Sequence, residues 1–398
     1  MDSYSAMMRN PGVTRIMGSQ LLARFAFGMM SLGFVIFISR NYGSYTLAGL
    51  ALGAETVGAA ISGPVLSRLI GQIGVRRLIS VTTTVTSALL LVLALVKLAE
   101  PVVVLVGLLI GLTSPPIQAS VRSIYPQLVP KRQQQRLFSL DATLQELIWI
   151  FGPVLATGVA ATVAPFAVMV LMAAVQMLGS FLFLINPEVG STKIPKSTAG
   201  LGNVLKNRAI MGLVVIGALL IGSFSGVEVG TVGILDTGTA GLVISVFSIG
   251  SLIGGFAIGP RAKNARWLIW FNLLILAGYA LSLVNPGNPW WLALCWFVSG
   301  LGIAPALGLT AMLVSVVLKH GDAAEAYGWI MSGQLAGYSI GAAIAGYFID
   351  NFGATSGLLV ASIFQVGTIA ACLLWLPSMP SFGNLDHTQS IPVIADQH

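Results

Sequence analysis

Residues 63–77 read GPVLSRLIGQIGVRR and join two long apolar segments, 46–67 and 78–98. Each flanking segment is about as long as the roughly 20 apolar residues that an α-helix needs to cross a membrane. Glycines in the joining residues favour a tight turn. The arginines of this turn are Arg68, Arg76 and Arg77. A short basic connection between two apolar segments predicts two membrane-spanning helices whose turn faces the cytoplasm.

The whole chain has the composition of a membrane protein. Of its 398 residues 56% are hydrophobic and 8% are charged, and the mean hydropathy is +0.90, whereas a soluble domain is about 25% charged. A soluble fold cannot hide this much apolar surface, because charged residues must cover its outside. The composition excludes a soluble enzyme, a disordered chain and a nucleic-acid-binding domain. The net charge of +7 does not change this, because the basic residues lie between apolar spans.

Twelve segments of the chain are apolar and long enough to be candidate spans. The connections between them are mostly short and contain Gly, Pro and Asn. The first segment has no cleavage signature behind it and is interpreted as a retained helix. The twelve segments are 14–38, 46–67, 78–98, 101–121, 138–162, 165–186, 208–234, 239–260, 266–284, 290–318, 327–349 and 355–377.

The distribution of Lys and Arg predicts the orientation. With the N-terminus inside, all but four of the twenty basic residues lie in cytoplasmic segments. The four exceptions are Arg24, Arg40, Lys97 and Arg122. The positive-inside rule therefore predicts that both termini are cytoplasmic.

Residues that would indicate metal, nucleotide or enzyme chemistry are scarce. Cys295 and Cys372 lie in apolar stretches, and the three histidines are scattered. The sequence has no Gly-x-x-x-x-Gly-Lys loop for ATP and no Ser-His-Asp set. We therefore expect no cofactor, no metal site and no enzymatic activity.

The chain is expected to be a duplicated half. The longest connection, residues 187–207, separates a first bundle at 1–186 from a second at 208–377, and a polar cytoplasmic tail follows at 378–398. Gly58 and Gly63 match Gly250 and Gly255 at one constant offset. Gln145 and Gly152 match Gln334 and Gly341 at another. Paired repeats with a site at their interface are a transporter architecture.

The turn at 63–77 resembles the signature loop between helices two and three of the major facilitator superfamily. That loop usually has Gly, three residues, Asp and Arg, then Gly and a basic pair; Ser67 stands here where the acid is usual. The resemblance implies two six-helix bundles, and Arg68, Arg76 and Arg77 as gating residues that bind helix ends and lipid phosphates. Gly152-Pro153 resembles the antiporter motif of the drug-efflux branch, which implies multidrug or small-solute export.

The resemblance implies that the first, fourth and fifth spans are neighbours, and four charged residues are expected inside them. Arg24 lies in the first span, Arg122 ends the fourth, and Asp141 and Glu146 begin the fifth. Ionisable residues are costly in a membrane, so each is a functional candidate. We expect one buried cluster near the cytoplasmic side. Two interpretations stay open: a structural ion-pair cluster, or a switch in which protonation of Asp141 or Glu146 releases an arginine.

Glu55 lies in the second span without an evident partner among its neighbours. A carboxylate removed from water favours its protonated form, so Glu55 is a candidate proton carrier. A salt bridge to another span and a role in cation binding stay open. Glu228, in the seventh span, is a candidate for contact with a proton or the substrate, because the resemblance places that span at the central cavity.

Uncharged candidates occupy matching places in the two halves. Gln145 and Gln334 are matched, and Trp149 and Tyr338 follow each by about one turn. Aromatic walls with a few amides suit an amphipathic organic substrate. Ordinary helix packing stays open for each residue. The further candidates for substrate binding are Gln20, Phe27, Gln118, Phe224 and Trp296.

The sequence thus predicts an all-α integral membrane protein with twelve transmembrane helices in two six-helix bundles. The expected function is secondary active transport by alternating access: proton-coupled export of an amphipathic small organic molecule by a monomer in a bacterial inner membrane. Its expected partners are the substrate, protons and membrane lipids. The alternatives are a transporter of a sugar, amino acid, nucleoside or other polar metabolite, and a non-transporting membrane receptor.

Overall fold

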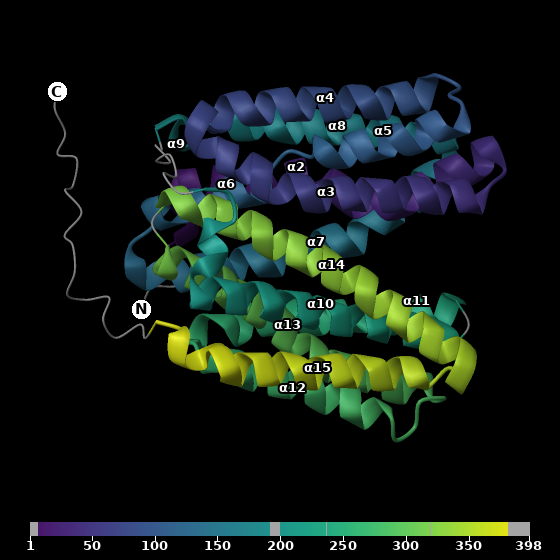
Figure 1. The fold of residues 1–398 in the computed structure, drawn as a ribbon, viewed down its shortest axis with the longest axis vertical. Helices are drawn as coiled ribbons and strands as arrows, with labels where there is room; N and C mark the ends of the chain where they lie inside the picture. Colours follow the sequence, from purple (N-terminus) through teal and green to yellow (C-terminus); the bar gives the residue numbers. More distant parts are fainter. Residues whose placement is uncertain (1–6, 192–199, 236, 319, 381–398) are drawn as a thin grey trace.

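The computed structural model describes residues 7–191, 200–235, 237–318 and 320–380, and these form helices without a β-strand (Figure 1). Parts of the predicted linker and tail, 192–199 and 381–398, lie outside the described residues. The helices of the first half are α2 (Pro11–Tyr42), α3 (Tyr45–Ile73), α4 (Val75–Leu95), α5 (Glu100–Leu112), α6 (Ile117–Leu128), α7 (Lys131–Thr162), α8 (Pro165–Leu184) and α9 (Pro187–Ser191).

The second half repeats the pattern of long helices. They are α10 (Arg208–Ile234), α11 (Thr237–Ala257), α12 (Trp267–Ser282), α13 (Pro289–Val317), α14 (His320–Phe352) and α15 (Ser356–Trp375). Short 3₁₀ turns are η1 (Asn203–Lys206), η2 (Gly259–Arg261) and η3 (Leu376–Ser378).

The all-helical membrane fold that the sequence predicts is confirmed. Ten helical segments of the described chain are long and apolar enough to cross a membrane. The other two predicted spans correspond to α12, which is apolar but has 16 residues, and to α14, which has 33 residues and an acidic first turn.

The predicted fourth span is broken in the middle. Its two parts, α5 and α6, flank Thr113–Pro116, where two consecutive prolines remove backbone donors and push the preceding residue out of the helical region. Hydroxyl groups satisfy the carbonyl groups that the break frees. Thr86 on α4 donates to the Thr113 carbonyl oxygen at 2.8 Å, and Ser62 on α3 donates to that of Gly111 at 2.9 Å. Such a break is tolerated in a membrane where protein rather than lipid surrounds it.

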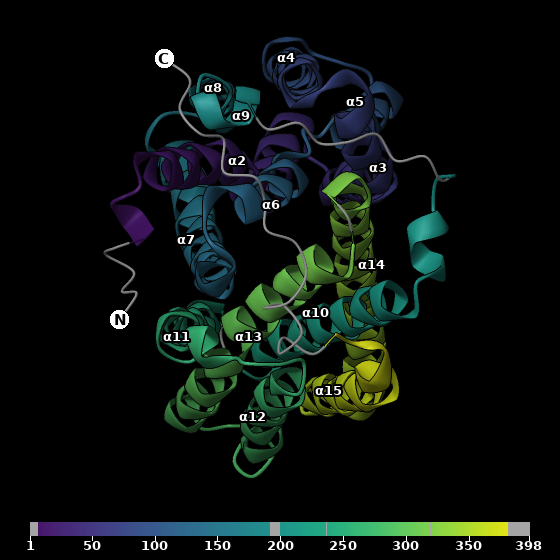
Figure 2. The ribbon, with the colours of Figure 1, turned by 90° about the vertical axis from the view of Figure 1, so that its left-hand side faces the viewer.

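The helices form two bundles, with α2–α6, α8 and α9 on one side and α10–α13 and α15 on the other, while α7 and α14 cross between them (Figures 1 and 2). We call the end that carries Arg76, Lys131, Arg208 and Arg261 the basic end, and the other the far end. Near the basic end α3 packs closely on α14. A Cβ atom on Gly328 would lie 2.5 Å from the Gly63 carbonyl oxygen, so this approach requires glycine.

Candidate functional site

A buried ion cluster joins α2, α6 and α7 of the first bundle. Asp141 on α7 has a side-chain exposure of 0% and lies between two arginines. Its Oδ1 is 3.2 Å from Arg24 Nη1, and its Oδ2 is 2.9 Å from Arg122 Nε. Tyr125 and Gln20 each donate a further hydrogen bond of 3.1 Å to Oδ1. The carboxylate is thus fully paired, as a charge that is removed from water must be.

The cluster carries more positive than negative charge. Arg24 and Arg122 have side-chain exposures of 9% and 8%, and Asp141 is the carboxylate that both contact. Neutral amides take up part of the remaining hydrogen-bonding capacity. Gln145 accepts from Arg24, and the amide oxygen of Gln118, when it faces Arg122, accepts from both terminal nitrogens at 2.7 and 3.0 Å. Two guanidinium groups therefore share one carboxylate in a buried position.

Glu146 does not join this cluster, which corrects the prediction of a four-residue group. It lies five positions after Asp141 on α7, so at about 100° per residue the two side chains point roughly 140° apart around the helix. Glu146 is buried and lies close to Ser251 of α11, at the seam between the bundles. The sequence places both carboxylates on one helix, but the opposite faces of that helix have different neighbours.

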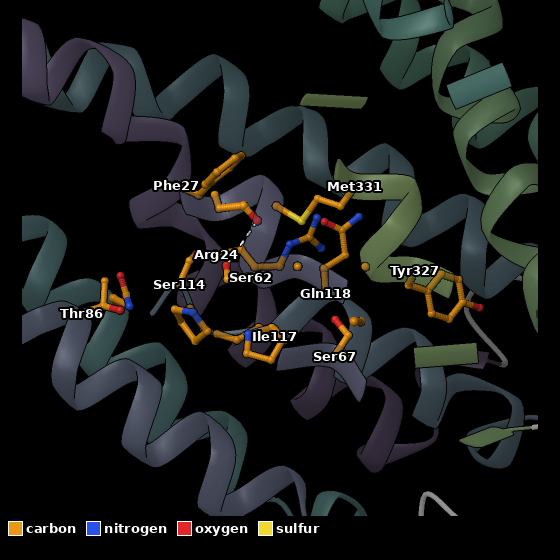
Figure 3. A pocket seen from close by; sticks show the side chains of 18 of the residues that line it. Arg24, Phe27, Ser62, Ser67, Thr86, Ser114, Ile117, Gln118, Tyr327 and Met331 are labelled. Carbon is orange, nitrogen blue, oxygen red and sulfur yellow. Dashed lines mark hydrogen bonds between the residues drawn. The ribbon is translucent and has the colours of Figure 1, made fainter. Parts of the chain in front are cut away.

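A cavity of about 90 Å³ lies beside the ion cluster (Figure 3). A buried water needs about 10–15 Å³ on this scale, so the cavity has the size of roughly half a dozen waters or a small organic molecule. It reaches from Thr86 and Gln176 inside the first bundle to Tyr327 and Met331 on α14 of the second. Arg24 is the charged residue among the residues that line it.

Five of the predicted site residues line the cavity: Arg24, Phe27, Gln118, Gln145 and Trp149. The rings of Phe27 and Trp149 meet edge to face with centroids 5.5 Å apart. Both residues line the cavity, so the aromatic pair forms part of its wall. Polar groups on one side and aromatic rings on another give the cavity an amphipathic lining.

Gln20 and Trp296 lie elsewhere. Gln20 is fully buried and bonds Arg24 and Asp141, so it belongs to the ion cluster rather than to the cavity lining. Trp296 is fully buried inside the second bundle, where its indole N–H donates to Thr231 at 3.2 Å and its ring packs on Tyr279. The expectation that these two side chains face a cavity is not met, because internal partners satisfy them.

The remaining candidates of the second bundle are also separate from the cavity lining. Gln334 lies against Gly217 of α10, and Phe224 packs on Phe247 with ring centroids 5.0 Å apart. Tyr338 donates a hydrogen bond of 2.7 Å to Glu228, which joins α14 to α10. The matched positions of Gln145 and Gln334 in the two halves therefore have different surroundings.

Glu55 is buried on α3 with a relative exposure of 4%. Its Oε2 accepts a long hydrogen bond of 3.4 Å from the neighbouring Thr56, and its Oε1 has no hydrogen-bond partner in the described chain. No ion pair reaches Glu55 within the described residues. The salt bridge that the sequence left open is therefore not observed.

An ion pair joins the two bundles at the basic end. Arg68 Nη1 on α3 is 2.9 Å from Oε2 of Glu325 on α14, and the carboxylate is fully buried. Its Oε1 accepts from the backbone N–H of Gly202 at 2.7 Å and from the Trp329 indole at 3.3 Å. Sequence reasoning missed Glu325; the available signal was a carboxylate two residues before a span, on the same side as the basic turn.

The other two arginines of that turn differ. Arg76 donates to the carbonyl oxygens of Leu184 and Asn186, at 3.1 and 3.4 Å, and so binds the end of α8. Arg77 is exposed. The turn thus contributes an inter-bundle contact through Arg68 and a contact within the first bundle through Arg76.

Two helical bundles, spans of membrane length and a seam with buried charges define a multi-pass membrane protein. The family model of the Major Facilitator Superfamily matches residues 16–235 and 231–389. The chain therefore belongs to this superfamily, and the resemblance drawn from the turn at 63–77 is confirmed.

Known proteins with the same architecture include two solved transporters. A bacterial homologue of the iron transporter ferroportin, in an outward-facing state, superposes with a TM-score of 0.74 at 15% identity, covering 92% of this chain and 99% of that one. The human organic anion transporter MFSD10 (TETRAN) superposes with a TM-score of 0.70 at 14% identity, covering 90% of this chain and 98% of that one. At these identities the likeness shows the fold.

A curated relative is the uncharacterized MFS-type transporter y4rN of Sinorhizobium fredii. It is 27% identical over 176 residues, which are 43% of this chain and 44% of that protein. The match therefore spans less than half the length of the relative.

Proposed function

We propose that this protein is a secondary active transporter that moves an amphipathic small organic molecule by alternating access. The two bundles rock about the seam and expose the cavity to each side of the membrane in turn. The basic end faces the cytoplasm of a bacterial cell under the positive-inside rule, which places both termini there. The protein works as a monomer, because each chain contains both bundles and the cavity between α7 and α14.

The cavity at the seam is the observation that carries this proposal. First-bundle residues provide its polar lining, and Tyr327 and Met331 of α14 close it from the second bundle. The Arg68–Glu325 ion pair and the Gly63–Gly328 approach hold α3 and α14 together near the basic end. A substrate in this cavity can leave toward the cytoplasm only when these contacts separate, which is the rearrangement that alternating access requires.

The lining supports an amphipathic substrate. Phe27 and Trp149 offer aromatic faces, while Arg24, Gln118 and Gln145 offer hydrogen bonds. A strongly polar metabolite is the alternative, which the same amides and arginine favour. The two structurally similar proteins are a homologue of an iron transporter and an organic anion transporter, so the same fold occurs with unlike named substrates. Fold similarity therefore does not decide between an amphipathic and a strongly polar substrate.

Proton coupling is assigned to Glu146, with Glu55, Glu228 and Asp141 as further candidates. Glu146 is buried at the seam near Ser251, so movement of α11 against α7 changes its surroundings directly. A proton can drive transport only if its affinity differs between the two states. Asp141 is held by two arginines, and its protonation would require rearrangement of the whole cluster. Export is the direction proposed, on the likeness of Gly152-Pro153 to the antiporter motif.

Transport by the reconstituted protein tests this function. The probes are three naphthalene derivatives of similar size: 2-naphthalenesulfonate, neutral 2-naphthylmethanol and (2-naphthylmethyl)trimethylammonium. We expect a pH gradient across proteoliposomes to drive accumulation of at least one probe. Glu146→Gln should abolish gradient-driven accumulation and retain exchange of probe across the membrane.

The matched control is Glu188→Gln, because Glu188 pairs with Arg15 in a partly exposed contact on α9, away from the seam. Accumulation by Glu146→Gln at the wild-type level would remove Glu146 from the coupling mechanism. Failure of every probe to cross or exchange would contradict an amphipathic substrate.

A further inference from the structure

The charge balance of the first bundle distinguishes between classes of substrate. Within the described residues, Asp141 is the carboxylate in contact with Arg24 and Arg122, which leaves one positive charge of the cluster unmatched. An unmatched buried charge is costly, and proteins compensate it with a counter-charge or shed it. Arginine does not shed its proton in proteins. A counter-charge from outside the chain would therefore be bound favourably.

The unmatched charge is accessible from the cavity. Arg24 lines the cavity, whereas none of the described lining residues is a carboxylate (Figure 3). Arg24 donates hydrogen bonds to Gln20, Asp141 and Gln145. A guanidinium has five donors, so two of its N–H groups remain for a ligand.

A second group in the lining also lacks an acceptor. The side chain of Gln176 on α8 is 4% exposed, and its Nε2 has no hydrogen-bond partner among the described residues. A buried amide donor without an acceptor costs free energy that a ligand oxygen would recover. Gln176 lines the same cavity as Arg24. Arg24 and Gln176 together favour a ligand that has several acceptor oxygens and carries negative charge.

We propose that the substrate is an organic anion whose carboxylate, sulfonate or phosphate group binds Arg24, while its apolar part packs against Phe27 and Trp149. This inference rests on the proposed function and narrows it to one charge class. An inorganic anion could bind Arg24 but has no apolar part to pack against Phe27 and Trp149, whose ring centroids are 5.5 Å apart. A lipophilic cation would face the guanidinium without a carboxylate in the lining to offset the repulsion.

The test is stabilisation of the purified protein against thermal unfolding by the three naphthalene probes and by inorganic sulfate. A ligand that binds only the folded state raises the unfolding temperature, and the stabilisation grows with the logarithm of the ratio of ligand concentration to Kd. We expect 2-naphthalenesulfonate to stabilise the protein and the neutral, cationic and inorganic probes to have little effect. Arg24→Met should weaken sulfonate binding by about tenfold or more, the usual range for a lost hydrogen bond to a charged group.

Two further variants keep the test decisive. Arg40→Met removes a positive charge from the same helix at the far end, where Arg40 contacts the Ala160 carbonyl oxygen, and should leave sulfonate binding unchanged. Arg24→Lys keeps the charge, and should retain part of the sulfonate effect even if Arg24→Met does not fold. Loss of sulfonate binding in Arg40→Met as well would show a general field effect and would contradict the site.

The outcomes separate the two proposals. Stabilisation by the cation alone, or by all three naphthalene probes equally, would overturn the anion assignment and leave amphipathic transport standing. Equal stabilisation by sulfate and by 2-naphthalenesulfonate would overturn the organic part. Stabilisation by none of the four would contradict both the anion assignment and the amphipathic substrate of the proposed function.

Discussion

The two bundles have the same order of helices but unlike interiors. The first bundle holds the cluster of Arg24, Arg122 and Asp141 beside a cavity that Arg24 lines. The second holds a neutral network, in which Gln365 donates to Asn272 at 2.8 Å and accepts from Ser223 at 2.9 Å. Both networks join helices that are distant in sequence. The first bundle thus holds a charged cluster beside its cavity, whereas the Gln365 network inside the second bundle is neutral.

The difference follows from what each network leaves unsatisfied. The amide groups of Gln365 and Asn272 and the hydroxyl group of Ser223 satisfy one another, and Asn272 also donates to the Leu268 carbonyl oxygen at 2.7 Å. The first bundle keeps an unmatched positive charge and the unpartnered amide nitrogen of Gln176. Satisfied networks stabilise and fix a core, whereas unsatisfied groups mark a place for a ligand. The comparison therefore supports the proposal that the first bundle recognises the substrate.

Removal of the shared carboxylate should have the largest effect. Asp141→Ala leaves two buried guanidinium groups without a counter-charge, which should lower the free energy of unfolding by about 3–5 kcal/mol. Chemical or thermal unfolding in detergent measures the loss. Asp350→Ala, at an exposed position on α14, is the control and should stay within about 0.5 kcal/mol of wild type. A similar small loss for Asp141→Ala would show that the cluster does not depend on its carboxylate.

Disruption of the Arg68–Glu325 ion pair should shift the equilibrium from the arrangement that is closed at the basic end toward one that is open there. Arg68→Gln leaves the buried Glu325 carboxylate with neutral donors, so the closed arrangement of α3 and α14 becomes less favourable. A cysteine placed at Met331, in the cavity, should then react with a maleimide added from the basic side on the order of fivefold faster.

The native cysteines give little background in this experiment, because Cys295 and Cys372 are buried. Arg77→Gln is the matched control, since Arg77 is an exposed arginine of the same turn. An unchanged labelling rate in Arg68→Gln would show that this ion pair does not hold the basic end closed.

The smallest effect should come from the matched glutamines, and it compares the bundles most directly. Gln145→Leu removes an amide of the cavity lining that can donate to the sulfonate, and should weaken 2-naphthalenesulfonate binding about three- to tenfold, as expected for one hydrogen bond. Gln334→Leu changes the equivalent position, which lies against Gly217, and should leave binding within about twofold. Titration of both variants with the probe measures the difference. Equal losses would indicate that both bundles contribute to the site.

The helices were predictable from the sequence, because apolar length is a local signal, whereas the Arg24–Asp141–Arg122 association was predictable only because the resemblance to the superfamily implied which helices are neighbours. The neighbours of Glu146 were not predictable. The helical period shows that Glu146 and Asp141 point in different directions, but it does not show which helix packs against each side chain. The burial of Trp296 and the pairing of Arg68 with Glu325 depend on contacts between distant helices. Pro115 and Pro116 were a signal for the break at Thr113–Pro116. The break was not predicted, because the surrounding segment is apolar and has the length of one uninterrupted span.

The most direct test of alternating access is the distance between spin labels at the two ends of the molecule. One pair replaces Gln72 and Lys263 at the basic end, and the other replaces Lys97 and Asn288 at the far end; all four positions are exposed. In Arg68→Gln, compared with wild type, we expect the basic-end distances to lengthen and the far-end distances to shorten together. Lengthening at the basic end without any shortening at the far end would contradict the rocking of two bundles about one seam.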